Sequence, residues 1–247
     1  MGILHREVGM VMSLRPPLNE RVMVALDVES RDKALEIAQE LKGSGCWVKV
    51  GLELYCSAGV EIVRELKEMG FRVFLDLKLH DIPNTVKRTV GVLAGCGADL
   101  LTLHCSGGYQ MMAEAVEVAR EASTTENAMK LIGITVLTSL DEQRLHEELG
   151  VERGLKDQVL KLAELGKKAE LAGVVASAQE ARELREFLGP DFLLITPGIR
   201  PAGSEVQDQA RTLTPREAIA AGSSYLVVGR PITRAAHPRE ALDKLWD

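Results

Sequence analysis

The feature that most constrains the fold is a regular alternation of short apolar runs with segments of helical periodicity, beginning at Val22. Such an alternation predicts repeated β-α units. We expect eight strands, at residues 22–27, 46–50, 71–76, 99–104, 131–136, 172–177, 192–197 and 225–229. Most of these runs are continuously apolar, which is typical of parallel strands covered on both faces.

Between the expected strands, apolar residues recur at the spacing of one helix face. Two such stripes are Ala34, Ile37, Ala38 and Leu41, and Met112, Ala115, Val116 and Ala119. We expect both stripes to pack against the sheet as core. Two connections are longer than usual, residues 138–155 after the fifth strand and residues 198–215 after the seventh, and both are candidate site elements.

Eight β-α units favour an α/β fold with a single (β/α)8 TIM barrel over a doubly wound sheet. No GxGxxG motif follows the first strand, so a dinucleotide-binding fold is disfavoured. A chain of 247 residues suits one barrel domain, and no linker divides it. We therefore predict an N-terminal extension at residues 1–20 and a catalytic barrel at residues 21–247.

Composition narrows the classes of partner. The formal charge of −6 provides no basic excess for binding nucleic acid. The sequence has neither a signal peptide nor an apolar stretch that would span a membrane, so we predict a cytoplasmic protein. Its four cysteines form no CxxC pair, and we expect reduced core thiols at Cys46, Cys56, Cys96 and Cys105.

Charged residues gather at the ends of the first four expected strands. They are Asp27, Lys49, Asp76 with Lys78, and His104. Because the active site of a barrel lies at the carboxyl ends of its strands, we interpret these residues as a candidate site rather than as unrelated surface charges.

The segment DLKLHDIPNT, residues 76–85, carries the central cluster of Asp76, Lys78 and Asp81. Strand periodicity places Asp76 and Lys78 on the face toward the barrel mouth. Neighbouring carboxylates favour the protonated form of Lys78, which suits stabilising a carbanion and then protonating it better than attack as a free amine. A structural ion pair and a metal held by Asp76 and Asp81 remain alternatives. Asp81 is also expected to be the N-cap of a helix with Pro83 in its first turn.

A phosphate site is predicted from the loops after the seventh and eighth strands, which often bind phosphate in barrels. These loops contain TPGIRP and VVGRPI, where Gly229 provides a close backbone N–H and Arg200 and Arg230 provide forked donors. The polar segment 198–212 has the composition of a loop that closes over a ligand, from which Gln209 would reach the phosphate. A simple surface loop is the alternative.

Together with VALD, KVG and VLTS, the motifs DLKLHDIPNT, TPGIRP and VVGRP resemble the orotidine 5'-monophosphate decarboxylase family. The resemblance spans about residues 20–245. DxKxxD is shared with related sugar-phosphate enzymes, whereas DIPNT and TPGIRP are more specific. Two departures are the N-terminal extension and Cys105, where the family more often has alanine.

The resemblance implies a role for each matched residue. Asp27 and Lys49 would contact the ribose, and Lys49, Asp76, Lys78 and Asp81 would form a network of alternating charge. Asp81, Ile82 and Thr85 would enter the site of a partner subunit, which implies a homodimer with shared active sites. Thr138 would contact the pyrimidine, and Arg200, Gln209, Gly229 and Arg230 would surround the phosphate.

The implied reaction converts orotidine 5'-monophosphate to UMP and carbon dioxide in de novo pyrimidine biosynthesis. The enzyme would be a cofactor-independent carboxy-lyase without a metal, with Lys78 as carbanion stabiliser and proton donor. Alternatives are a metal-dependent sugar-phosphate decarboxylase or synthase of the same wider family, a non-catalytic barrel that binds nucleotide phosphate, and a barrel isomerase, which would need a poised general base.

Overall fold

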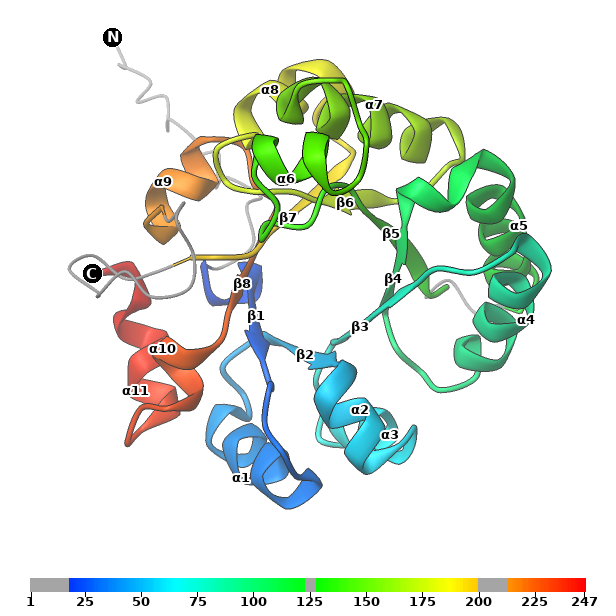
Figure 1. The fold of residues 1–247 in the computed structure, drawn as a ribbon. Coiled ribbons are helices and arrows are strands. Elements are labelled where there is room, and N and C mark those ends of the chain that lie inside the picture. The colour runs from blue at the N-terminus through cyan, green and yellow to red at the C-terminus, as the bar shows by residue number, and fades with distance from the viewer. Residues whose placement is uncertain (1–17, 123–127, 200–212) are drawn as a thin grey trace, which may run out of the picture.

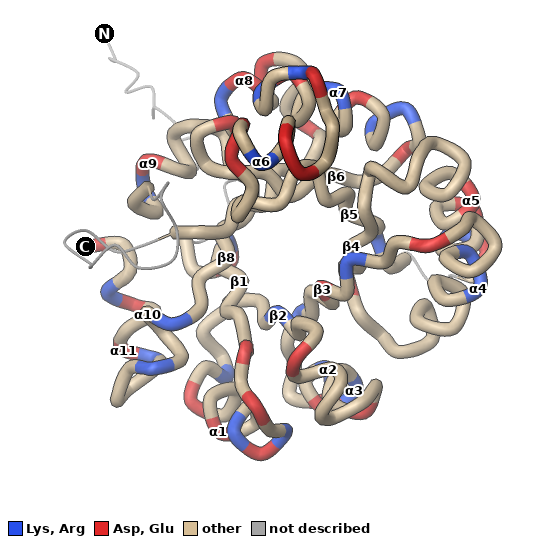
Figure 2. Tube along the Cα trace, viewed as in Figure 1, with Lys and Arg blue, Asp and Glu red and all other residues tan. Residues whose placement is uncertain are grey.

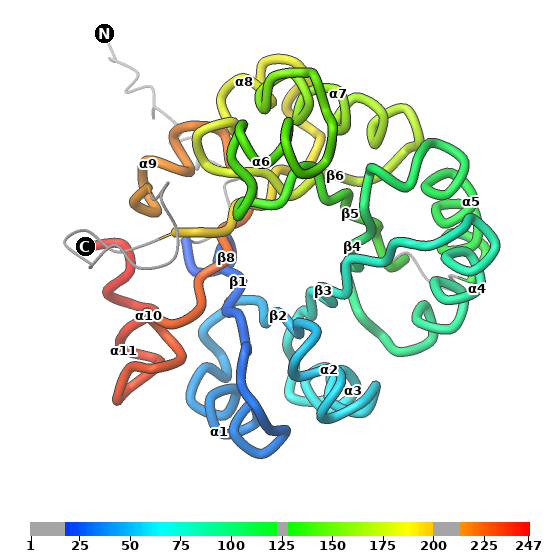
Figure 3. The backbone as a smooth tube through the Cα atoms, in the orientation of Figure 1, coloured from blue at the N-terminus to red at the C-terminus, as the bar shows by residue number. Residues whose placement is uncertain are grey.

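The computed structural model describes residues 18–122, 128–199 and 213–247, and these residues form a closed barrel of eight parallel strands (Figure 1). The strands are β1 (Val22–Ala25), β2 (Trp47–Gly51), β3 (Val73–Leu79), β4 (Leu100–His104), β5 (Lys130–Ile134), β6 (Gly173–Val175), β7 (Leu193–Thr196) and β8 (Tyr225–Val228). Each strand pairs with the next along the chain, and β8 pairs with β1, as their adjacent blue and orange segments show (Figure 3). The predicted (β/α)8 barrel is confirmed.

The helices form an outer ring around the strands (Figure 1). They are α1 (Arg31–Leu41), α2 (Leu52–Ala58), α3 (Glu61–Glu68), α4 (Pro83–Ala94), α5 (Gly108–Glu121), α6 (Glu142–Glu147), α7 (Leu155–Lys168), α8 (Ala181–Leu188), α9 (Pro215–Ala220), α10 (Arg230–Thr233) and α11 (Pro238–Asp243). Short 3-10 helices lie at Leu18–Arg21, Cys105–Gly107 and Lys244–Trp246. None of the helices in the described ranges is long and apolar enough to cross a membrane.

The core has two layers because side chains alternate between the two faces of each strand. Met23, Trp47, Phe74, Leu100, Ile132 and Ile195 fill the barrel interior. The intervening strand residues pack outward against the helices. The two apolar stripes predicted on α1 and α5 face these residues and are buried, as expected. Gly173 allows β6 to approach β7 closely, because a Cβ there would collide with the carbonyl oxygen of Leu193.

The strand boundaries differ from the prediction mainly at the mouth of the barrel. β1 ends at Ala25, two residues before the predicted end at Asp27. β3 was predicted to end at Asp76 but continues to Leu79. Its pairing with β4 is irregular between Leu75 and Leu79, so the apolar run alone did not reveal where the strand ends.

One other expectation needs correction. Cys46, Cys96 and Cys105 are buried thiols, but Cys56 is exposed on α2 because it lies on the solvent side of that helix. Burial raises the pKa of the Cys105 thiol to about 12. The long connection after β5 contains the short helix α6, whose N-cap Asp141 accepts a hydrogen bond from the Arg144 amide.

Some predictions fall outside the described residues. They concern nearly all of the N-terminal extension and most of the loop after β7. The two described residues that flank this loop, Ile199 and Leu213, form a parallel β-bridge, so the loop begins and ends at neighbouring points of the structure.

Candidate active site

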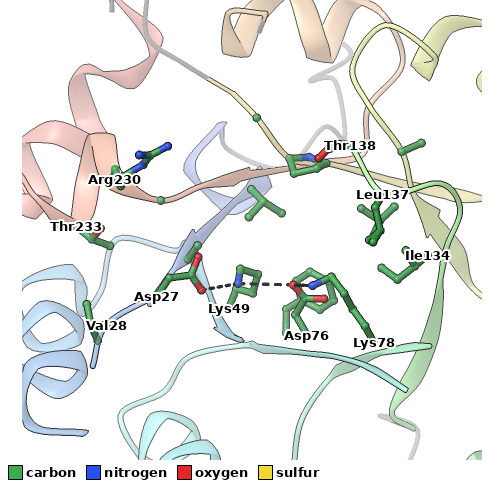
Figure 4. A pocket seen from close by; sticks show the side chains of 18 of the residues that line it. Asp27, Val28, Lys49, Asp76, Lys78, Ile134, Leu137, Thr138, Arg230 and Thr233 are labelled. Atoms are coloured by element: carbon green, nitrogen blue, oxygen red, sulfur yellow. Dashed lines mark hydrogen bonds and ion pairs between the residues drawn. The ribbon is translucent and has the colours of Figure 1, made fainter. Parts of the chain in front are cut away.

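A cavity of about 660 Å³ opens at the carboxyl ends of the strands (Figure 4). Seven residues predicted for the site line it: Asp27, Lys49, Asp76, Lys78, Thr138, Gly229 and Arg230. They come from both halves of the chain, and the closed barrel brings them together because all the strands point the same way. In Figure 2, most charged residues lie on the outer helices, whereas those of β2 and β3 lie at the inner ring.

Four charged side chains form a row of alternating sign across the floor of the cavity (Figure 4). Lys49 Nζ lies 2.8 Å from Asp27 Oδ1 and 3.6 Å from Asp76 Oδ2. Lys78 Nζ donates to the same Asp76 Oδ2 at 2.7 Å. We call Asp27, Lys49, Asp76 and Lys78 the charged row.

The inner members of the row are buried and the outer members face the cavity. Lys49 and Asp76 are almost fully buried, whereas the Lys78 side chain is 33% exposed and that of Asp27 is 54% exposed. Lys78 can therefore meet a ligand while remaining paired with Asp76.

The ionised form of Asp76 is favoured by its neighbours. Burial raises its pKa, but Lys49, Lys78 and the hydrogen bonds from Lys78 and Thr102 together outweigh burial and hold the pKa of Asp76 below its usual range. The carboxylate is therefore a permanent negative charge between two ammonium groups at neutral pH.

The backbone at Lys78 is unusual. Its φ of 51° lies in the left-handed region, which non-glycine residues seldom adopt and which costs roughly 1–3 kcal/mol. The strand periodicity that we used to place Asp76 and Lys78 on one face therefore does not hold in simple form, although the two side chains do meet. The adjacent Leu77 and Leu79 pack against the helix layer, as predicted.

Gly51 in the KVG motif makes room for the other end of the row. A Cβ on Gly51 would lie 2.8 Å from Asp27 Oδ1 and 3.0 Å from Lys49 Nζ. Any larger residue at this position would push the ion pair apart. The KVG motif thus contains both Lys49 and the glycine that leaves space for the Asp27 carboxylate.

The cavity has chemically distinct ends (Figure 4). Arg230 and Thr233 lie at the end away from Lys78, and the backbone of Gly229 borders the same region. Ile134 and Leu137 lie on the side nearer Lys78, with Thr138 above them in this view. The arrangement suits an elongated ligand with an anionic end near Arg230 and a reacting group near Lys78.

Three of the residues predicted for the site do not line this cavity. Asp81, Ile82 and Thr85 are exposed at the start of α4. The prediction of Asp81 as N-cap is wrong: the N-cap is Ile82, and the Asp81 carboxylate accepts from the Ile82 amide at 2.7 Å. Asp81 lies one position too early because Pro83 already begins the helix.

The remaining two predicted residues, Arg200 and Gln209, lie outside the described residues. The sequence analysis also missed a contact residue, Thr102 on β4. Its hydroxyl donates to Asp76 Oδ1 at 3.0 Å and accepts from the Lys78 amide at 2.8 Å. Period-two alternation in the run LLTLH would have placed Thr102 on the same face as His104.

His104 lies beside the row without joining it. Its ring stacks on His80 with centroids 5.1 Å apart, and burial together with the nearby His80 and Lys78 lowers the pKa of His104, against a smaller opposing effect of Asp76. In the described ranges, this site included, no three His, Cys, Asp or Glu side chains are arranged to hold a metal ion.

Comparison with known proteins gives consistent matches. The model of the "Orotidine 5'-phosphate decarboxylase / HUMPS family" matches residues 20–245. Orotidine 5'-phosphate decarboxylase of Pseudoalteromonas translucida is 48% identical over 89% of this chain and 93% of its own length. The enzyme of that name from Vibrio cholerae is 49% identical over 91% and 96%, respectively.

Solved structures agree with these relatives. The crystal structure of orotidine 5'-phosphate decarboxylase from Lactobacillus acidophilus has a TM-score of 0.82 and 38% identity, and the match covers 91% of this chain and 96% of that one. An uncharacterized conserved protein from Geobacillus kaustophilus has a TM-score of 0.80 and 42% identity, with 92% and 100% covered.

The lowered pKa of Asp76 predicts an acid-dependent loss of stability. In the unfolded chain an aspartate titrates near pH 4, so Asp76 stabilises the fold above that pH, and the stabilisation is lost as pH falls through its lower folded pKa. Between about pH 5 and pH 3, the free energy of unfolding should therefore fall more steeply in the wild type than in Asp76→Asn.

Urea unfolding at each pH, followed by circular dichroism, measures this difference. Asp191→Asn, at an exposed aspartate before β7, is the matched control and should follow the wild type. Parallel curves for the wild type and Asp76→Asn would contradict the assignment of a stabilised carboxylate at position 76.

Proposed function

The chain belongs to the orotidine 5'-phosphate decarboxylase / HUMPS family, and from this premise we propose how its residues carry out the reaction. It is a carboxy-lyase that decarboxylates orotidine 5'-phosphate in pyrimidine biosynthesis, and it does so without a cofactor. The observation that supports our assignment of the chemistry is the position of Lys78 Nζ, which faces the cavity and lies 2.7 Å from a buried carboxylate.

We propose that the substrate lies along the cavity with its phosphate at Gly229 and Arg230 and its pyrimidine between Thr138 and the charged row. Asp27 and Lys49 then bind the ribose hydroxyls. Arg200 and Gln209, which lie outside the described residues, are the further phosphate contacts in this proposal. Arg230 at one end of the cavity and the paired charges of the row at the other support this orientation.

In the chemical step, the bond between C6 and the carboxylate carbon breaks and leaves its electron pair on C6. The Lys78 ammonium stabilises this carbanion and then transfers a proton to C6, giving UMP and carbon dioxide. Asp76 orients Lys78 for that transfer through the hydrogen bond from Lys78 Nζ to Asp76 Oδ2.

Repulsion between the substrate carboxylate and Asp76 is too weak to account for catalysis. The repulsion energy of two like charges about 4 Å apart, at an effective dielectric constant near 20, is roughly 4 kcal/mol. Enzymes lower the activation free energy of their reactions by as much as about 23 kcal/mol. Most of the acceleration must therefore come from stabilisation of the carbanion by Lys78 and from binding energy at the remote phosphate.

We also propose a homodimer in which Asp81, Ile82 and Thr85 complete the partner's charged row. Within one subunit these residues are exposed and do not line the cavity. Ile82 is 65% exposed and Val92, on the same helix α4, is 78% exposed, which is apolar surface of the kind that subunit interfaces cover. We place the enzyme in the cytoplasm, where its buried thiols would stay reduced.

The first prediction concerns Lys78. Lys78→Ala should lower turnover of orotidine 5'-monophosphate by at least about 10³-fold, because both charge stabilisation and proton donation are lost. Binding of UMP, measured by calorimetry, should remain detectable. Lys161→Ala, at an exposed lysine on α7, is the control and should turn over normally.

Retained turnover in Lys78→Ala would remove Lys78 from the chemical step. The wild-type assay should also be run with a chelator. Loss of activity under that condition would favour the rival reading of a metal-dependent sugar-phosphate decarboxylase or synthase.

The second prediction concerns the phosphate end. Arg230→Ala should raise KM for orotidine 5'-monophosphate by about 10- to 100-fold, because a hydrogen-bonded charge is lost. The same variant should decarboxylate the nucleoside orotidine, which lacks the phosphate, at nearly the wild-type kcat/KM. Arg120→Ala, at an exposed arginine on α5, is the control. Equal losses with both substrates would refute the phosphate assignment.

The third prediction tests the shared site. Lys78→Ala and Asp81→Asn should each be nearly inactive alone. When equal amounts are mixed and the subunits exchange, about a quarter of the active sites should become intact, and activity should recover to that fraction of the wild type. Each mixed dimer would then pair an intact Lys78 with an intact Asp81 in one of its two sites.

Lys49→Ala mixed with Lys78→Ala is the matched control, because both residues lie in one subunit's row and no mixed dimer gains an intact site. Failure of the first mixture to recover activity, with subunit exchange verified by mass spectrometry, would show that Asp81 does not act across subunits.

A further inference from the structure

The pairing of β3 with β4 is interrupted beside the charged row. Leu75 is opposite Leu101, and the next paired residues are Leu79 and Leu103. Between these pairs β3 carries Asp76, Leu77 and Lys78, whereas β4 carries Thr102 alone. The strand therefore bulges at the residues that carry the chemistry, and its backbone groups there need partners other than the regular ladder.

The Thr102 side chain provides that partner. Its Oγ1 accepts a hydrogen bond from the Lys78 amide at 2.8 Å and lies 3.0 Å from Asp76 Oδ1. A hydroxyl has one hydrogen, and the Asp76 carboxylate is an acceptor, so the hydroxyl proton is directed to Asp76. Both hydrogen-bonding roles of the hydroxyl are thus used on two adjacent members of the row.

Thr102 is placed to act only through these neighbours. It is fully buried and does not line the cavity, so a substrate in the cavity does not touch it. Asp76 Oδ2 is already occupied by Lys78 Nζ and lies near Lys49 Nζ, and Thr102 fixes the other oxygen. The carboxylate plane is therefore held from both sides.

We propose that Thr102 is a positioning residue for decarboxylation: its hydroxyl holds Lys78 in the left-handed backbone conformation and orients Asp76. The proposal rests on the proposed role of Lys78 as proton donor. Without the hydroxyl, the Lys78 amide loses its acceptor inside the barrel and the strained φ of 51° loses the contact that maintains it. The Lys78 ammonium then no longer starts from a fixed point relative to C6, and a small displacement of a catalytic group is costly in rate.

The test compares four variants with similar side chains. Thr102→Val removes the hydroxyl but keeps a β-branched shape, and Thr102→Ser keeps the hydroxyl. Thr196→Val is the matched control, because Thr196 is a buried barrel threonine whose hydroxyl bonds Ser223 instead of the charged row. Thr102→Cys, with a weaker donor and acceptor, adds an intermediate step and serves if Thr102→Val does not fold.

We expect Thr102→Val to lower kcat for orotidine 5'-monophosphate by about 10- to 100-fold, the range for lost hydrogen bonds to a charged group. KM and UMP affinity should stay within about threefold, since no ligand contact changes. Thr102→Ser should recover most of the rate, Thr102→Cys should be intermediate, and Thr196→Val should match the wild type. In protein labelled with ¹⁵N-lysine, the Lys78 amide should exchange with solvent faster in Thr102→Val alone.

Three results would overturn the proposal: wild-type kcat in Thr102→Val, equal losses in Thr102→Ser and Thr102→Val, or a loss in Thr102→Val matched by Thr196→Val. The Lys78→Ala variant separates this inference from the proposed function. If Lys78→Ala is inactive while Thr102→Val is normal, only the positioning role fails. If Lys78→Ala retains turnover, the role of Lys78 itself fails.

Discussion

The structure of the site depends on one buried carboxylate shared by two ammonium groups. Lys49 and Lys78 both approach Asp76 Oδ2, and burying either lysine without that carboxylate would leave an uncompensated charge. Asp76 therefore serves both the fold and the proposed chemistry, because its negative charge offsets the free-energy cost of placing lysine side chains where little water reaches them. The cost of the arrangement is visible in the left-handed backbone of Lys78, which is retained because surrounding contacts fix it.

The separation of the two ends of the cavity explains how a site without a strong electron sink can work. Arg230 and Gly229 follow β8, whereas Lys78 belongs to β3, so the phosphate binding and the carbanion stabilisation that we propose lie at different ends of the cavity. A rigid closed sheet lets binding energy at one side hold the reacting atom at the other, since paired strands do not yield independently.

The barrel and the charged row were predictable from the sequence, because both follow from periodic apolar runs and from charged residues at the ends of those runs. The apolar runs gave the barrel, and charged residues at strand ends gave Asp27, Lys49, Asp76 and Lys78. The features that could not be predicted depend on how β3 pairs with β4. Period-two alternation places Thr102 on the face of His104, but its hydrogen bond from the Lys78 amide depends on a bulge in β3, and a bulge is invisible in a pattern of apolar residues. The N-cap was misplaced by one residue because the helix begins at Pro83, which makes Ile82 the N-cap although its side chain makes no capping hydrogen bond.

The pairing of β1 with β8 has a consequence for how the molecule is made. On the ribosome, β1 through β7 emerge with one edge of the sheet open, and the ring cannot close until residues 225–228 have left the exit tunnel. Gly229 and Arg230 follow immediately, so closure of the ring and synthesis of the proposed phosphate-binding residues are separated by only a few residues. A nascent chain, or one truncated before β8, would expose an unpaired strand edge and would be a target for chaperones or proteases rather than a partly active enzyme.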